Sequence, residues 1–203
     1  MARNVGVSCG VWTERDRLTD EVLMTAYAHG DRRSFVALFR RWAPRVHGFF
    51  LRALGEPAAA DDLLQITFLN VHRARRKFRP LLPLRGWLFS IAAHALQDEL
   101  RRRKRIPLAT EEQQEAVTDT VVAEDEPVSL ESRQRARKVR AAMERLPESQ
   151  RAVLYLHRFE QMSFAEVARV LGTSEGAVRL RAFRAYERLR RELVAVLQED
   201  DAA

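Results

Sequence analysis

The chain has 203 residues, of which 46% are hydrophobic and 31% charged, and its formal net charge is +7. The scarcity of Pro and Gly favours helices over a turn-rich β fold. No apolar run approaches the roughly 18 residues of a membrane span, and no signal-peptide pattern is present, so we expect a cytoplasmic protein without direct membrane insertion. Cys9 is the single cysteine. The sequence has no cysteine and histidine cluster with metal-ligand spacing, no phosphate-binding loop and no set of catalytic residues. We therefore expect no metal, no cofactor and no enzymatic activity.

The charge is unevenly distributed along the chain. Residues 1–106 carry a net charge of +10, residues 107–132 of −8 and residues 133–203 of +5. Two basic blocks around an acidic one predict two nucleic-acid-binding domains joined by an acidic connector. Because residues 107–132 show little apolar periodicity, we expect them to form a flexible linker.

Helical periodicity fills both basic blocks, which predicts an all-α protein of two small helical domains. Residues 1–17 lack such periodicity and are expected to form a disordered extension. The helix limits expected from caps and breakers in the first block are Thr19 to Gly30, Asp31 to Gly55, a start near Pro57, and a last helix from near Leu84 into Arg105.

The helix expected over residues 61–73 has an apolar face and a mixed face on a helical wheel. Two acids, a glutamine, a histidine and two aliphatic side chains form the mixed face: Asp61, Asp62, Gln65, Ile66, Leu69 and His72. Such a face is typical of a protein-docking surface. The alternative is that Ile66 and Leu69 cover another part of the same domain.

The helix expected over residues 86–103 also has two faces. Its polar face combines a tryptophan with short polar side chains and leads into a basic run: Trp87, Ser90, His94, Gln97 and Arg101, then residues 102–105. This combination suits single-stranded DNA, because bases stack on the aromatic ring while cations bind phosphates. The alternative is a buried Trp87 and a basic helix end that complements the helix dipole.

Residues 163–178 have the pattern of a helix-turn-helix. Ser163 and Glu166 form a capping box, Gly172 supplies the turn, and Ser174 caps the second helix. One side of the second helix is apolar and faces inward. The other side carries side chains suited to the major groove, Arg179, Leu180, Phe183 and Arg184, with Arg181 as a phosphate contact. The alternative is a basic helical hairpin that never meets DNA.

In this order, these segments resemble an extracytoplasmic-function (group IV) sigma factor of bacterial RNA polymerase. DDLLQITFLNVHRA is similar to the family's clamp-binding helix, and GWLFSIAAHALQDELRRRKR to its −10-reading helix. The segment from Leu146 to Leu193, with its helix-turn-helix, is similar to the −35-binding domain. The resemblance implies that residues 18–106 are sigma domain 2 and residues 133–203 sigma domain 4.

The resemblance also implies partners and roles. Core RNA polymerase would be bound through its β′ clamp coiled coil, at Asp61, Asp62, Gln65, Ile66 and Leu69, and through its β flap. The −10 element of promoter DNA would be melted and read by the loop and helix carrying Lys77, Arg79, Trp87, Ser90, His94, Gln97 and Arg101. The −35 element would be read by Arg179, Leu180, Phe183 and Arg184. An anti-sigma factor would hold the two domains apart or mask them.

Three positions depart from the family pattern. Ile66 stands where glutamate is usual, Ala93-His94 where arginine-asparagine is usual, and Leu180 where a small polar residue is common. We therefore expect a different clamp contact and different promoter preferences.

Two other functions fit parts of the pattern. A stand-alone helix-turn-helix regulator would bind a palindromic duplex tightly without polymerase. A sigma mimic that sequesters an anti-sigma factor would need no arginines on its recognition helix, so Arg179 and Arg184 argue against it.

Overall fold

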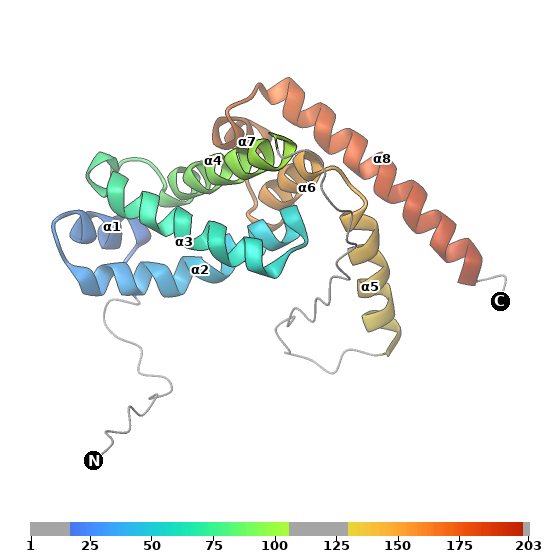
Figure 1. Cartoon of the computed structure of the whole chain (residues 1–203), viewed down its shortest axis with the longest axis horizontal. Helices are drawn as coiled ribbons and strands as arrows, with labels where there is room; N and C mark the ends of the chain where they lie inside the picture. Colours follow the sequence, from blue (N-terminus) through green and yellow to red (C-terminus); the bar gives the residue numbers. More distant parts are fainter. Residues whose placement is uncertain (1–16, 106–129, 201–203) are drawn as a thin grey trace, which may run out of the picture.

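The computed structural model describes residues 17–105 and 130–200, and every regular element in these ranges is helical (Figure 1). The elements are α1 (Asp20–Ala28), α2 (Arg32–Leu54), α3 (Pro57–Ala74), η2 (Arg75–Lys77), α4 (Leu84–Arg105), α5 (Leu130–Glu144), α6 (Glu148–Leu154), η3 (Tyr155–Phe159), α7 (Phe164–Leu171) and α8 (Glu175–Asp200). Cys9 and most of the predicted linker lie outside the described residues. α5 begins at Leu130, three residues before the predicted domain start. Within the described ranges, no helix is long and apolar enough to cross a membrane.

The helices of the first block begin and end where the sequence predicts. Thr19 accepts a hydrogen bond from the backbone N–H of Val22, and Asp31 accepts one from Arg33. Gly55 ends α2 in the left-handed region (φ 80°), which glycine adopts without a Cβ clash. These local signals delimit α1 and α2 before any tertiary contact is made.

The first bundle, α1 to α4, is built around α2. α2 packs against α1 and α3, and α3 packs in turn against α4. Phe49 and Phe50 of α2 are fully buried, and the Phe49 ring meets the Phe89 ring of α4 edge to face at 5.7 Å. Burying aromatic side chains of this size supplies a large share of the stabilisation of a small domain.

The second bundle, α5 to α8, contains the helix-turn-helix of α7 and α8. Ser163 and Glu166 make the predicted capping box, each side chain bonding the other's backbone N–H. Gly172 ends α7 in the left-handed region (φ 61°), and Ser174 accepts a hydrogen bond from the Ala177 N–H at 3.2 Å. The helix-turn-helix expected from the sequence is therefore formed.

The two bundles pack directly against each other. α7 lies beside α4 and α6 beside α2, as Figure 1 shows at the centre of the molecule. One cluster of buried apolar side chains runs across the boundary, from Phe49 in α2 to Tyr155 and Leu156 after α6. The sequence predicts two domains but gives no sign of this contact.

Candidate nucleic-acid and protein interfaces

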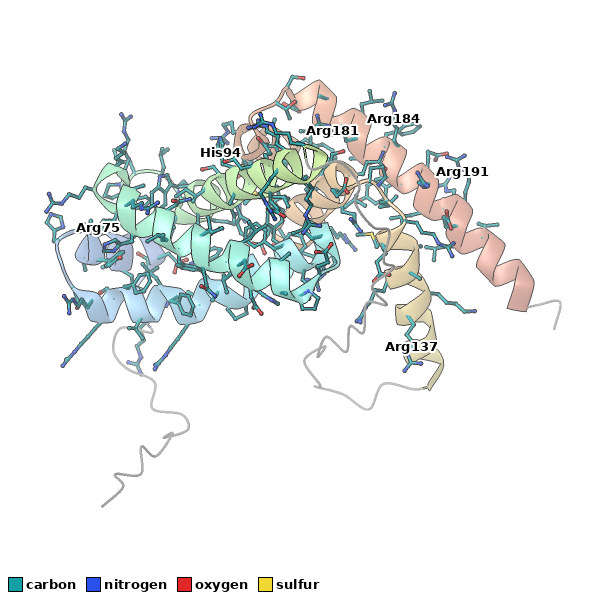
Figure 2. The ribbon with its side chains drawn as sticks, in the orientation of Figure 1. Arg75, His94, Arg137, Arg181, Arg184 and Arg191 are labelled. Atoms are coloured by element: carbon teal, nitrogen blue, oxygen red, sulfur yellow. The ribbon has the colours of Figure 1, made fainter. Side chains whose placement is uncertain are left out.

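The recognition helix α8 presents the predicted outward side chains to solvent. Leu180 is 48% and Phe183 63% exposed, and Arg179 and Arg184 are exposed as well. Figure 2 shows Arg184 on the outer edge of α8, pointing away from the bundles. Val178, Ala182 and Ala185 are buried on the opposite side and hold the helix against its bundle. The face is therefore presented by a rigidly packed helix.

The two arginines of this face differ in their surroundings. Arg179 forms an ion pair with Glu175 at 2.6 Å and lies 5.2 Å from the centre of the Phe164 ring. Within the described ranges, Arg184 has no acidic group at ion-pair distance. Arg184 can thus meet a guanine edge or a phosphate without first losing a partner, whereas Arg179 must exchange one.

The polar face of α4 presents a hydrogen-bonding histidine. Ser90 Oγ donates to the Trp87 carbonyl at 2.7 Å, and His94 Nδ1 lies 2.6 Å from the Ser90 carbonyl. Because a carbonyl oxygen only accepts, Nδ1 is the donor. In the tautomer that carries its proton on Nδ1, Nε2 is an acceptor, complementary to an amino group on a base edge.

Trp87 is neither fully buried nor freely exposed. Its ring meets Phe78 edge to face at 5.3 Å and packs against the core, while part of it reaches the surface.

The basic end of α4 is largely paired with acids. Arg101 pairs with Asp98, and Arg102 with Glu99, while Arg103 reaches both Glu99 and Glu56 at 2.7 Å. The Arg102 and Arg103 hydrogen bonds lower the pKa of Glu99 to about 2, despite the opposing effect of burial. The run therefore ties α4 to the start of α3 as well as supplying positive charge.

A cavity of about 570 Å³ opens between the end of α1 and the segment after α3. Its wall includes His29, Arg75, Arg76, Phe78 and Pro80. Arg75 is labelled in Figure 2 beside α1. The lining combines one phenylalanine ring with two arginines, groups that can contact a base and a phosphate respectively.

The loop that borders this cavity carries features that sequence reasoning missed. Leu81 is 98% and Leu82 54% exposed, next to the exposed cations Lys77 and Arg79. Two leucines between Pro80 and Pro83 were the available signal, because prolines at both ends keep the segment out of a helix.

The mixed face of α3 is exposed as predicted. Asp61 pairs with His47 at 3.3 Å, and Asp62 and Gln65 are exposed. Ile66 is 45% and Leu69 48% exposed, so these two residues do not cover another part of their own domain.

The exposed apolar surface of α3 extends to α2, which the sequence did not indicate. Val36 is 46% and Phe39 38% exposed, and the Phe39 ring meets that of Phe68 in α3 at 4.7 Å. We call Asp61, Asp62, Gln65, Ile66, Leu69 and Phe39 the α3 face. Acids around an exposed apolar centre favour a protein partner with basic and apolar groups.

Comparison with known proteins identifies a family for each of the two helical bundles. The family model for Sigma-70 region 2 matches residues 38–106, and the model for Sigma-70 region 4 matches residues 136–189. The molecule is thus a two-domain sigma factor, a promoter-recognition subunit rather than a stand-alone helix-turn-helix protein. The first four helices and the last four are accordingly called region 2 and region 4 below.

Its full-length relatives narrow the class. RNA polymerase sigma factor CarQ of Myxococcus xanthus is 37% identical over 175 residues, covering 86% of this chain and 97% of CarQ. The ECF RNA polymerase sigma factor SigM of Mycobacterium tuberculosis is 34% identical over 179 residues, covering 88% of this chain and 87% of SigM. The chain belongs to the extracytoplasmic-function family of sigma factors, which confirms the resemblance seen in the sequence.

Solved structures share the fold. CnrH, solved in complex with the cytosolic domain of CnrY, matches with a TM-score of 0.59 and 28% identity over 87% of this chain and 97% of CnrH. RpoE of Bartonella quintana, solved in complex with the anti-sigma factor NepR, matches with a TM-score of 0.65 and 21% identity over 79% of this chain and 97% of RpoE.

Proposed function

We propose that this chain binds core RNA polymerase and directs it to the −35 and −10 elements of promoters that serve a specialised stress or envelope response. The observation that carries the proposal is that one chain exposes three separate surfaces. These are the arginine-bearing face of α8, the α4 face with its neighbouring cavity, and the α3 face. A sigma factor needs all three, whereas a repressor needs only the first.

The α3 face is the proposed docking surface for the β′ clamp coiled coil. Asp61 and Asp62 supply the charge that a basic partner helix would meet, and Ile66, Leu69 and Phe39 supply apolar area at the centre. Interfaces with an apolar centre and a charged rim are typical of specific protein complexes. The β flap is the proposed partner of region 4.

The α4 face and the cavity are the proposed site of −10 recognition. Trp87 offers a surface for stacking, His94 an acceptor for a base edge, and the cavity accepts a base that leaves the duplex. Strand opening would then be driven by capture of unstacked bases, without nucleotide hydrolysis. Lys77, Arg79, Ser90, Gln97 and Arg101 complete the proposed contact set.

The α8 face is the proposed −35 reader. Arg179 and Arg184 would contact guanine edges or phosphates, Leu180 and Phe183 a thymine methyl group or sugar, and Arg181 a phosphate. An anti-sigma factor is a further proposed partner, since RpoE was solved in complex with the anti-sigma factor NepR and CnrH in complex with the cytosolic domain of CnrY.

The proposal is tested by mixing the purified chain with core polymerase that lacks any sigma factor, followed by gel filtration. We expect stoichiometric co-elution, and we expect D62R to reduce it. A stand-alone regulator would instead bind a duplex and elute separately from an active core. A mimic would bind neither the core nor promoter DNA.

A further inference from the structure

The side chain of Arg179 is held by two neighbours on the outward face of α8. Its Nε and Nη2 donate to one carboxylate oxygen of Glu175, at 3.0 and 2.6 Å. Its guanidinium carbon also lies over the ring of Phe164 in α7, 5.2 Å from the ring centre. Arg184 is exposed and, within the described ranges, has neither an acid at ion-pair distance nor an aromatic ring in contact with its charge. Of the two arginines on this face, Arg179 is therefore the one whose orientation is fixed before DNA arrives.

The two neighbours of Arg179 differ in what they leave free. Glu175 occupies N–H donors, so its carboxylate has to be exchanged before those donors can meet a guanine edge or a phosphate. The Phe164 ring attracts the cation through its negative face and takes up no strong hydrogen bond. Because the ring carries no net charge, it also does not repel a phosphate. Phe164 can keep its hold on Arg179 while Glu175 is exchanged for DNA.

The Phe164 ring is itself fixed from within region 4. It stacks on the ring of His157, with 4.2 Å between the ring centres and an angle of 25° between the planes. His157 Nδ1 donates to the Met162 carbonyl at 2.7 Å, which sets the orientation of the imidazole. Phe164 is half-buried, packs against the apolar core and is the first residue of α7 after its cap, Ser163. The support under Arg179 is thus anchored to the bundle and does not depend on the outward face.

The backbone before α7 brings His157 against Phe164. Residues seven apart in one continuous α-helix lie about 10 Å apart along its axis, too far for stacked rings. Here η3 is a single π-helical turn, and Gln161 after it has a positive φ of 52°. Both conformations are uncommon for residues other than glycine, and they persist where surrounding contacts hold them. The turn therefore serves the stack of His157 and Phe164, which faces the start of the recognition helix where α7 packs beside α8 (Figure 1).

A fixed guanidinium matters for reading bases and much less for binding phosphates. A bidentate contact with guanine requires one orientation of the side chain, whereas attraction to a phosphate is satisfied from many. Immobilising a long side chain at an interface costs binding free energy, and a side chain that is already held loses less on binding. The support of Arg179 therefore favours binding of the correct sequence over binding of any duplex.

We propose that Phe164, with His157 stacked on it, is a positioning residue that presents Arg179 to the bases of the −35 element. The inference deepens the proposed function and rests on it, since Arg179 has a base to read only if α8 meets that element. Phe164 itself contacts no base and acts through Arg179 alone.

The first test needs no DNA and measures the order of the arginine side chains. Nitrogen-15 relaxation of the Nε–H groups is recorded on the full-length parent chain, with R179K and R184K identifying the two signals. We expect the Arg179 group to be more ordered than that of Arg184. E175Q removes the carboxylate and should leave part of this difference, and E175Q with F164L should abolish it. Loss of the whole difference in E175Q alone would show that the carboxylate holds Arg179, which overturns the proposal.

The second test asks whether Phe164 acts through Arg179. The probe is a short duplex selected from a random-sequence pool by the parent chain bound to core polymerase, with a scrambled duplex as reference. F164L should weaken binding of the selected duplex roughly two- to tenfold and leave binding of the scrambled duplex unchanged. In an R179A background, F164L should have no further effect. The proposal is overturned if F164L costs the same with and without Arg179, weakens both duplexes alike or weakens neither.

Two variants separate positioning from a general effect on the fold. F164Y keeps an aromatic ring and should retain the parent's affinity for the selected duplex. F159L removes a ring of the same bundle that stacks on Tyr155, so we expect it to leave the discrimination between the duplexes unchanged. Circular dichroism shows whether each variant keeps its helices.

The two tests also distinguish this inference from the proposed function. If the chain fails to bind core polymerase, or if R179A binds the selected duplex as tightly as the parent, then reading of the −35 element by Arg179 is wrong. The relaxation measurement still decides whether Phe164 holds the Arg179 side chain, because it is made without DNA or polymerase.

Discussion

At the scale of single residues, Arg184 is the side chain best placed to read DNA. It is exposed near the start of α8 and has no acid at ion-pair distance within the described ranges, whereas Arg179 is paired with Glu175. We predict that R184A weakens binding of a −35 duplex by about 1–3 kcal/mol and leaves core binding unchanged. Fluorescence anisotropy on a −35 duplex and a scrambled duplex measures the loss. An equal loss of affinity for the −35 duplex and the scrambled duplex would show that Arg184 contacts phosphate and reads no base. The matched control is R191A, which removes a positive charge farther along α8.

Glu99 gives a residue-scale prediction about stability. Its folded-state pKa is about 2, lowered first by the Arg102 hydrogen bond, against a usual value of 4.5. A lowered pKa stabilises the fold above pH 4.5, and this contribution disappears as the pH falls towards 2. We predict that E99Q lowers the free energy of unfolding by on the order of 1 kcal/mol at pH 7, a difference that shrinks on acidification.

Urea unfolding of E99Q and the parent chain between pH 7 and pH 3 measures this difference. D98N is the control, because Asp98 is 74% exposed and its pair with Arg101 lies at the surface. A difference that stays constant with pH would show that Glu99 acts through packing and not through its charge.

At the scale of elements, α3 carries a prediction about the polymerase. D62R places a cation on the α3 face without touching the buried side formed by Leu63, Phe68 and Val71. We predict at least a tenfold weaker affinity for core polymerase, because like charges across an interface are costly. D98R, a similar reversal on α4, should not change core affinity in the absence of DNA. Unchanged affinity for D62R would remove α3 as the docking helix.

α4 and its loop carry a second prediction. W87A removes the ring that packs on Phe78 beside the cavity. We expect slower opening of a duplex promoter and near-normal transcription from a template already melted around −10, because only the first requires capture of unstacked bases. Equal losses on both templates would mean that Trp87 serves the fold alone.

The elements were the most predictable part of this molecule. Thr19, Gly55, Ser163 and Gly172 delimit helices through contacts within a few residues, so the sequence alone places those ends. The outward faces of α3 and α8 were also predictable, because helical periodicity depends only on the local order of apolar and polar residues. The pairing of the basic run with Glu56 could not be foreseen, since Glu56 and Arg103 meet only after α3 and α4 pack.

At the scale of the whole molecule, packing of the two regions was beyond prediction. The contact joins Arg45 to Glu160, 115 residues apart, through a π-helical turn and a positive φ that leave no periodic signature. The charge pattern indicated two basic domains, and like charges favour keeping such domains apart. At the boundary, however, Glu160 and Glu166 of region 4 pair with Arg45 and Arg85 of region 2.

The measurement that tests the central claim most directly is transcription from a linear duplex promoter by core polymerase supplemented with this chain. The template would be found by sequencing fragments that the reconstituted enzyme retains from the source genome. We predict transcripts from one defined start, absent with core alone and abolished by R184A together with W87A. Transcripts without a defined start, or the same output with and without the chain, would contradict the assignment as a promoter-recognition subunit.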